Sequence, residues 1–513
     1  MSWTFKHASK ACLNAWWARA HQQRIFGAFS HAKTRQNAPT RPQSNPKVAP
    51  SDGCTFCDIF RRRGGGREER GASWRPSYLN GKYNTAPKMS TNPPKHVAFV
   101  LDGAQKRTNI ADVDTTCGSG WLIYAMQSEI AERFLAEPKL HGYIYDYLAA
   151  TKNKSRVHPG QKYTEVIIAE DVLWAYRLEM HSNVKLTILL WDPFRDFIMA
   201  TYGTKPQTLK KVLVHQGFDI LVHNASQLMH DCNDAVLWGD DPLQKDEYYR
   251  RLRSLTPIFP VWPPLQAVRY SAKTFSIIQA LRSPPYRVPG LQTFIPREQV
   301  TVRVDKWRMY KREATTHGIH VHDGRIYPRG LIDQDRKQNR GRWVWFEMPR
   351  HPSLSNAGQI RVYMSQGRLT HVVHTTRVGN QLEGSPVRCV LRPEEIQMPN
   401  ANLSTGAFVG IFEREGGTME ARTKAMEEIR EMCNHIISNM TTHLEEKSMH
   451  GGFCLAQCCR LDFGVLPLLG SHKWIITGMT WGCGMDLYAS VDPQNAVVFI
   501  DTVLDAVINR WNA

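Results

Sequence analysis

The sequence lacks a long apolar run. No uninterrupted stretch approaches the roughly 20 residues needed to cross a bilayer, so we expect no membrane partner. It also lacks an apolar core with a small-residue cleavage site near its N-terminus, which argues against secretion. The 11 cysteines are odd in number and scattered along the chain. They indicate reduced thiols, and we expect an intracellular, cytoplasmic protein.

Acidic residues are missing from positions 1–51, which contain eight Lys or Arg. This composition fits a mitochondrial transit peptide, and it also fits a disordered basic tail. Residues 1–95 hold 17 Lys or Arg against four Asp or Glu, so most of the net charge of +18 lies in this tail. We therefore do not expect nucleic acid to bind except through the tail.

The motifs of several common ligand sites are also missing. No GxxxxGK[ST] occurs, which excludes a P-loop, and Gly482-Cys483-Gly484 lacks the third glycine of a dinucleotide site. Cys54 and Cys57 form a CxxC without a second pair at zinc-finger spacing. His320 and His322 would share one face of a strand and, with His317 and Asp323, could bind a metal, but an alternating histidine pair is more often incidental.

From residue 96 onward, apolar runs alternate with helical patterns, which predicts an α/β protein. We expect buried strands over 96–101, 165–169, 184–191 and 219–223, and helices over 119–148 and 209–216. The strongest helical pattern covers 418–447, and we assign its stripe to core packing: Ala425, Ile429, Met432, Ile436 and Met440. A hairpin over 461–465 and 474–479 and a helix over 497–510 follow.

The stretch from Trp307 to Thr376 contains the parts of a cradle for a nucleoside triphosphate. A Lys311-Arg312 pair ends a short apolar run, and the small-residue loop 314–318 follows at once. An aromatic strand then ends in Glu347, and the next strand carries Arg361 at its centre. These residues would supply a fixed cation, a loop for the phosphates, a bidentate phosphate ligand and an acceptor for the nucleoside.

These motifs resemble the ATP-grasp fold, the family of ATP-dependent carboxylate–amine ligases. Lys311-Arg312-Glu313 followed by residues 317–321 is similar to its lysine strand and flexible loop. Gly358 to Val362 resembles its G-E-x-R-V strand, with Gln359 where Glu is usual, and Arg460-Leu461-Asp462 resembles its R-x-D metal strand. The resemblance spans about 194–481. Together with the composition, it predicts a disordered basic tail at 1–95, an α/β pre-domain at 96–260 and an ATP-grasp-like nucleotide-binding module at 261–513.

The resemblance also implies cofactors and roles. ATP and Mg²⁺ would be the cofactors, and a carboxylate would be activated as an acyl phosphate. Lys273 and Lys311 would hold phosphates, Glu347 the nucleoside, Arg361 and Arg460 the phosphate or acyl phosphate, and Asp462 the Mg²⁺. We expect Lys311, Glu347, Arg361 and Asp462 to line one cleft. Two alternatives stay open, namely that Lys273 is an ordinary surface lysine and that Arg460 and Asp462 form a structural ion pair.

The metal strand departs from the family pattern. In the partner strand, Gly478 stands where the family places a Glu, and Thr480 stands where it places an Asn. Mg²⁺ prefers carboxylate oxygens, so either Asp486 or another acid completes the site, or the protein binds nucleotide without efficient turnover, or it does not bind nucleotide at all. The second hypothesis is therefore a degenerate relative that acts as a binding or interaction protein without catalysis. A third hypothesis is a nucleic-acid binder that works through the tail. The sequence does not indicate a particular substrate.

Overall fold

The computed structural model describes the greater part of the chain after residue 92, in separate ranges. Of the basic tail, only residues 93–95 fall within them. The CxxC at 54–57, the loop at 314–318, His320 and Asp486 lie outside them. The described residues are 93–101, 121–137, 140, 144–146, 163–200, 205–223, 242–266, 270, 273–288, 291–292, 308–313, 321–324, 329–338, 344–349, 359–375, 387–391, 419–447, 452–468, 471–481 and 493–512.

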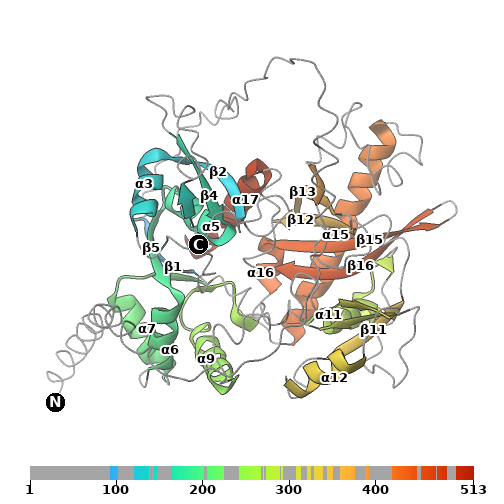
Figure 1. Ribbon diagram of the computed structural model, residues 1–513, viewed down its shortest axis with the longest axis horizontal. Coiled ribbons are helices and arrows are strands. Elements are labelled where there is room, and N and C mark those ends of the chain that lie inside the picture. The colour runs from blue at the N-terminus through green and yellow to red at the C-terminus, as the bar shows by residue number, and fades with distance from the viewer. Residues whose placement is uncertain are drawn as a thin grey trace, which may run out of the picture. The chain divides into compact units, whose positions relative to one another are not determined.

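The first sheet is parallel, with helices packed against it (Figure 1), and its strand β1 is buried on both faces. Its strand order is β5-β1-β6-β7, formed by β5 (Val184–Leu190), β1 (Lys95–Leu101), β6 (Ile220–His223) and β7 (Val261–Trp262). Helices α6 (Trp191–Met199), α7 (Pro206–His215) and α9 (Pro242–Leu255) cover one face, where Ala98 and Val100 of β1 are buried. Val97, Phe99 and Leu101 join a larger core on the other face, with α5 (Glu170–Glu179). Burial on both faces explains why β1 reads as one continuous apolar run.

The helix expected over 119–148 is wrong. This segment forms β2 (Trp121–Gln127), α3 (Ser128–Ala136) and β3 (Ile144–Asp146), and both strands pair antiparallel with β4 (Tyr163–Ala169). Helical periodicity is real only in α3, where Ala131 and Phe134 are buried. The aromatic and apolar residues of β2 instead suit a paired strand, so the pairing with β4 overrides the weak local pattern.

Two further sheets are built from the C-terminal half of the chain. The smaller has the order β10-β9-β11, formed by β10 (Val321–Asp323), β9 (Arg308–Arg312) and β11 (Trp345–Pro349), and α12 (Arg329–Gln338) follows β10 in the chain. The larger has the order β14-β13-β12-β15-β16-β8, formed by β14 (Val387–Leu391), β13 (Arg368–Thr375), β12 (Gln359–Ser365), β15 (Cys459–Leu468), β16 (Ser471–Trp481) and β8 (Leu291–Gln292). The expected hairpin is confirmed as β15 and β16, the long pair in Figure 1.

The expected long helix is confirmed as α15 (Met419–Glu446). Its stripe is core packing as predicted, since Ile429, Met432, Ile436 and Met440 are buried, although the side chain of Ala425 lies outside the described set. The elements that contact α15 include α11 (Thr274–Arg282), the 3₁₀ turn Pro284–Tyr286 and α16 (Gly452–Gln457). The α/β class predicted from the sequence is confirmed.

The last helix, α17 (Pro493–Asn512), connects the first sheet to the six-stranded sheet. Phe499 lies edge-on to Trp174 of α5 and to Tyr363 of β12, with ring centroids 6.4 and 5.7 Å apart. Arg177 of α5 donates two hydrogen bonds to Asp501, at 2.7 and 2.6 Å. One hydrophobic core therefore contains residues from both sides of the boundary expected at 260/261, and β7 extends the first sheet just past it. The placing of that boundary stays a prediction.

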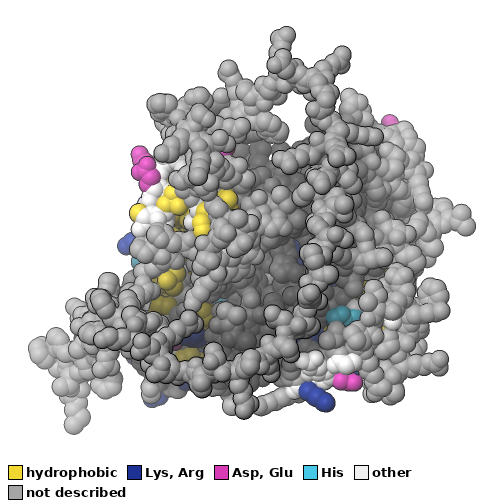
Figure 2. Space-filling view, viewed as in Figure 1, with side chains coloured by type: hydrophobic (Ala, Val, Ile, Leu, Met, Phe, Trp, Pro, Cys, Tyr) yellow, Lys and Arg dark blue, Asp and Glu magenta, His cyan; other side chains and the backbone are white. Residues whose placement is uncertain are grey.

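Few large hydrophobic side chains of the described residues reach the surface. Met180, Val214 and Val498 are 36, 54 and 45% exposed. On the face shown in Figure 2, the described hydrophobic side chains lie in small groups rather than in one broad area. None of the described helices is long and apolar enough to span a bilayer.

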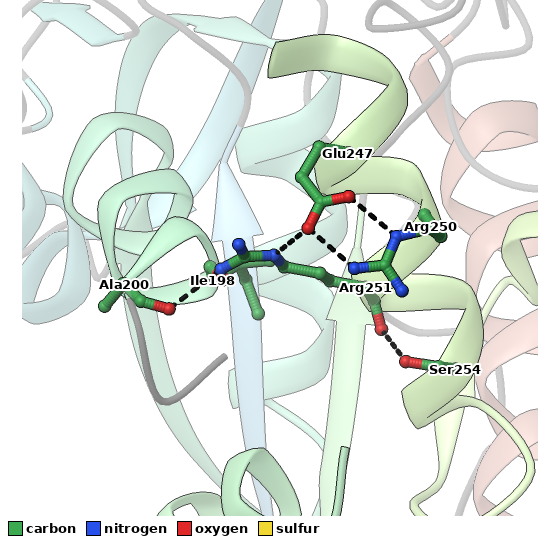
Figure 3. Close-up of polar contacts among 6 residues, drawn as sticks. All are labelled: Ile198, Ala200, Glu247, Arg250, Arg251 and Ser254. Atoms are coloured by element: carbon green, nitrogen blue, oxygen red, sulfur yellow. Dashed lines mark hydrogen bonds and ion pairs between the residues drawn. The ribbon is translucent and has the colours of Figure 1, made fainter. Parts of the chain in front are cut away.

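A buried arginine joins α9 to the end of α6 (Figure 3). Arg251 donates to the carbonyl oxygens of Ile198 and Ala200 at 3.0 and 2.8 Å, where α6 ends. Its Nε also donates to Glu247 Oε1 at 2.6 Å, one turn earlier on α9. Glu247 is shared with Arg250, whose side chain is 56% exposed, whereas that of Arg251 is 10% exposed. The buried arginine thus satisfies carbonyls that the end of a helix leaves without partners.

Replacing Arg251 by Met should lower the free energy of unfolding by about 1–3 kcal/mol, because it leaves buried carbonyl groups unsatisfied. The matched control is Arg250→Met, which removes the same charge from the same carboxylate at an exposed position and should change stability much less. Urea denaturation of both variants measures the difference. Equal losses in the two variants would contradict a role for the Arg251 carbonyl contacts.

Candidate functional site

The hairpin β15–β16 and its neighbour β12 bring three charged side chains to one face of the six-stranded sheet. Asp462 of β15 lies directly opposite Arg361 of β12 and, on its other side, opposite Gly478 of β16. Arg460 is two residues before Asp462 on the same strand. Residues two apart in a strand, and residues opposite each other in neighbouring strands, share a face of the sheet. Arg361, Arg460 and Asp462 are therefore neighbours because of the register.

Arg460 holds the carboxylate of Asp462 with two hydrogen bonds. Its Nε donates to Oδ1 at 2.9 Å and its Nη2 donates to Oδ2 at 3.1 Å. The two side chains are 11 and 13% exposed. Fork-shaped pairs of this kind are among the strongest charged hydrogen bonds in proteins. The ion pair between Arg460 and Asp462, left open as an alternative from the sequence, is thus present.

A third cation comes from the other sheet. Lys311 of β9 donates from Nζ to the backbone oxygen of Thr477 at 3.1 Å. The register of β15 and β16 shifts at this point, because Asp462 faces Gly478 whereas Phe463 faces Ile476. Thr477 is therefore the extra residue of a β-bulge, and its carbonyl is not used by a regular ladder partner.

The bulge is fixed by a short chain of hydrogen bonds. Gln359 donates from Nε2 to Thr477 Oγ1 at 3.2 Å, and Thr477 Oγ1 donates to the backbone oxygen of Asp462 at 3.1 Å. Sequence analysis gave no role to Thr477 and noted Gln359 only as a departure from the family pattern. The isolated Gly478 inside an apolar strand was a usable signal, since such glycines often mark bulges.

The electrostatics of this cluster are dominated by positive charge. Burial lowers the pKa of Lys311 to about 8; Asp462 opposes this decrease, and Arg460 and Arg361 reinforce it. Burial acts to raise the pKa of Asp462, but the charges of Arg460, Arg361 and Lys311 outweigh it and hold that pKa below 3.8. Within the part of the chain that the structure describes, three cations thus share one carboxylate. We call these four residues the cation cluster.

The cation cluster does not fit Mg²⁺. Both oxygens of Asp462 already accept from Arg460, and the residues opposite it are an arginine and a glycine. Mg²⁺ needs carboxylate and other oxygen ligands in octahedral geometry. No group of three or more His, Cys, Asp or Glu among the described side chains is arranged to hold a metal ion. The assignment of Asp462 as a magnesium ligand stays a prediction that this arrangement of donors does not favour.

Glu347 and Lys273 make none of the contacts given for the cation cluster. Glu347 is 4% exposed and lies opposite Tyr310, which packs with Trp345 and Ile332 of α12. Lys311 lies opposite Phe346, which belongs to the hydrophobic cluster on the other face of β9 and β11. Since alternate residues point to opposite faces, Glu347 and Lys311 face different sides of their sheet. Lys273 is the exposed residue that precedes α11.

The other candidate ligand groups take structural positions. His322 stacks on Trp345, with ring centroids 5.7 Å apart and an interplanar angle of 14°. Cys454, Cys458 and Cys459 are fully buried free thiols, in agreement with the reduced cysteines expected from the sequence. Burial raises the pKa of Cys454 and of Cys459 well above its usual range, so both are protonated thiols at neutral pH.

No protein-family profile matches this sequence, and no curated protein matches it. Solved structures that the chain resembles include D-cycloserine synthetase DcsG, at 9% identity and a TM-score of 0.39 over 80% of this chain and 99% of that one. Another is a D-alanine–D-alanine ligase from Bacillus anthracis complexed with ATP, at 8% identity and a TM-score of 0.36 over 82% of this chain and 97% of that one. A third is the ATP-grasp ligase PsnB complexed with a minimal precursor, at 10% identity and a TM-score of 0.31 over 57% and 79%. At such identities and TM-scores the likeness assigns no role to any residue.

Replacing Asp462 by Asn should lower the free energy of unfolding at pH 7 by about 3 kcal/mol, because the cations of the cluster lose their shared counter-charge. The pKa of Asp462 is lowered in the folded protein, so its contribution is present above 3.8 and is lost as the pH falls through the folded value. The stability difference between wild type and variant should therefore shrink in acid.

Urea denaturation over a pH series measures this difference. Asp196→Asn is the control, because that carboxylate is 59% exposed and pairs only with the adjacent Arg195 among the contacts of the described residues. A difference between wild type and Asp462→Asn that stays constant from pH 7 to pH 3 would show that the charge of Asp462 is not what stabilises the cluster.

Proposed function

We propose that this protein binds the phosphates of ATP at the cation cluster. The observation that carries the proposal is the convergence of Lys311 from one sheet with Arg361 and Arg460 from another around the carboxylate of Asp462. A triphosphate presents several charged oxygens in a row, so it needs cations held at fixed positions on more than one element. Arginine binds phosphate oxygens in a bidentate manner, and lysine binds them as a point charge.

Beyond ATP binding, we propose a ligase-like reaction on a carboxylate substrate. A carboxylate oxygen would attack the γ-phosphorus of ATP, the bond from that phosphorus to the β–γ bridging oxygen would break, and ADP would leave. The product is an acyl phosphate, which an amine can then attack. Arg361 and Arg460 would stabilise the charge on the transferred phosphoryl group, and Lys311 would hold the phosphates of the nucleotide. Lys273 as a further phosphate ligand and Glu347 as the nucleoside ligand stay predictions.

A second candidate is a related protein that binds ATP without turnover. The observation that favours it is the pairing of both Asp462 oxygens with Arg460, together with Gly478 at the facing position. The two candidates differ in one measurable product. An acyl phosphate reacts with hydroxylamine to form a hydroxamate, whereas simple ATP binding forms none. Incubation with ATP, a panel of amino acids and other small carboxylates, and hydroxylamine therefore separates them.

Replacing Arg361 by Met should weaken ATP binding by about 1.5–3 kcal/mol, the scale of a hydrogen bond to a charged group, which is about tenfold to over 100-fold in Kd. The control is Lys211→Met, which removes one positive charge from an exposed position on α7 and should leave affinity unchanged. Calorimetric titration with ATP measures both. Equal affinity in wild type and Arg361→Met would place the phosphates elsewhere.

ATP affinity should also fall as the pH rises through 8, because Lys311 loses its proton near its pKa of about 8 and with it a positive charge. The phosphates do not cause this decrease, since their last ionisation, with a pKa of about 6, is complete by then. Titrations at pH 7, 8 and 9 test this expectation. The Lys311→Met variant should bind more weakly and lose the step, and a step that persists in the variant would exclude Lys311 as its origin.

A further inference from the structure

We infer that the cation cluster takes a polyphosphate that is not complexed with a divalent metal, with the guanidinium of Arg460 lying where a bridging cation would otherwise sit. The inference rests on the proposed function, because it names the form of the nucleotide that the same site binds. It concerns binding and does not depend on turnover.

Both carboxylate oxygens of Asp462 are already occupied by hydrogen bonds from Arg460. A divalent cation bound at this carboxylate would have to replace one or both hydrogen bonds from Arg460, which measure 2.9 and 3.1 Å. It would then also lie close to Arg361, which is directly opposite Asp462 across β12 and β15. Repulsion between like charges at such short range is strong where water is largely excluded. Among the described residues, the site therefore favours an anion beside Arg460 over a further cation.

The second step concerns the strand opposite Asp462. A side chain at position 478 would point directly at the carboxylate, since a Cβ placed there would lie 3.4 Å from Asp462 Oδ2. A second acid at this position would therefore complete a pair of carboxylates for a metal. In this chain the position is glycine, and the nearest charged partner of Asp462 is an arginine on its own strand. The hairpin thus carries positive charge where a metal pair would carry negative charge.

A ligand at the cation cluster would meet mainly positive charge. Lys311, Arg361 and Arg460 approach Asp462 from three strands in two sheets. A metal-free triphosphate carries two more negative charges than its Mg²⁺ complex and has more oxygens available to arginine and lysine. Fixed cations held in this way neutralise phosphate charge as a bound metal would, and they need no rearrangement. The free anion is therefore the form that matches the cluster.

The test is a titration of the full-length protein with ATP in the presence of EDTA and, separately, with excess Mg²⁺. We expect ATP to bind at least as tightly in EDTA, and we expect inorganic tripolyphosphate to compete with it there. Tighter binding in EDTA follows because Mg²⁺ competes with the cluster for the same phosphate oxygens. Binding that requires Mg²⁺ would overturn the inference and leave the proposed function standing. The absence of ATP binding under both conditions would overturn both.

A pair of variants at Gly478 gives an independent measurement. Gly478→Glu and Gly478→Gln add side chains of nearly equal size beside Asp462 and differ in charge, so any cost of the added Cβ is common to both. The metal-free site predicts that Gly478→Glu binds ATP about tenfold more weakly than Gly478→Gln, with or without Mg²⁺. Tighter Mg²⁺-dependent binding by Gly478→Glu would show that a metal completes the site and would overturn the inference. Melting temperatures confirm that both variants fold.

Discussion

The carboxylate of Asp462 is the constraint on which the candidate site depends. Three cations lie near it, and without a shared counter-charge their mutual repulsion would force them apart. The register of β12, β15 and β16 fixes where that carboxylate lies, and the bulge at Thr477 supplies the carbonyl that holds Lys311 from the neighbouring sheet. The hydrogen bond from Lys311 to the bulge thus links two sheets that share no hydrogen-bonded strand pair among the described strands.

The same arrangement accounts for the lowered pKa of Lys311. The ammonium group of Lys311 is partly withdrawn from water, and it is accompanied by two guanidinium groups, so its proton is held less firmly than in an exposed lysine. An anion that enters the cluster would reverse that effect, because it favours the charged form of each cation. Bound negative charge would therefore lower the repulsion among the cations of the cluster, in line with the phosphate binding that we propose.

The sequence predicted the buried parallel strands well, because residues buried on both faces of a sheet leave continuous apolar runs such as the one in β1. It also named Lys311, Arg361, Arg460 and Asp462 as candidates, and the structure brings these four side chains together, although their roles stay predictions. It failed at 119–148, where a short helix between two strands produced a mixed pattern that only the pairing with β4 resolves. It placed Glu347 beside Lys311, because the face to which a strand residue points depends on a register that spacing along the chain does not reveal.

The helix α17 has a consequence for how the chain folds. Arg177 and Asp501 are 324 positions apart, and Phe499 completes the packing around both Trp174 and Tyr363. During synthesis, α5 and the strands it covers leave the ribosome long before their partner helix exists. Their apolar face stays open over that interval, and closing so long a loop is entropically costly and slow. Such a chain is exposed to aggregation until its last helix arrives, so its yield in the cell should depend on chaperones that shield the first sheet in the meantime.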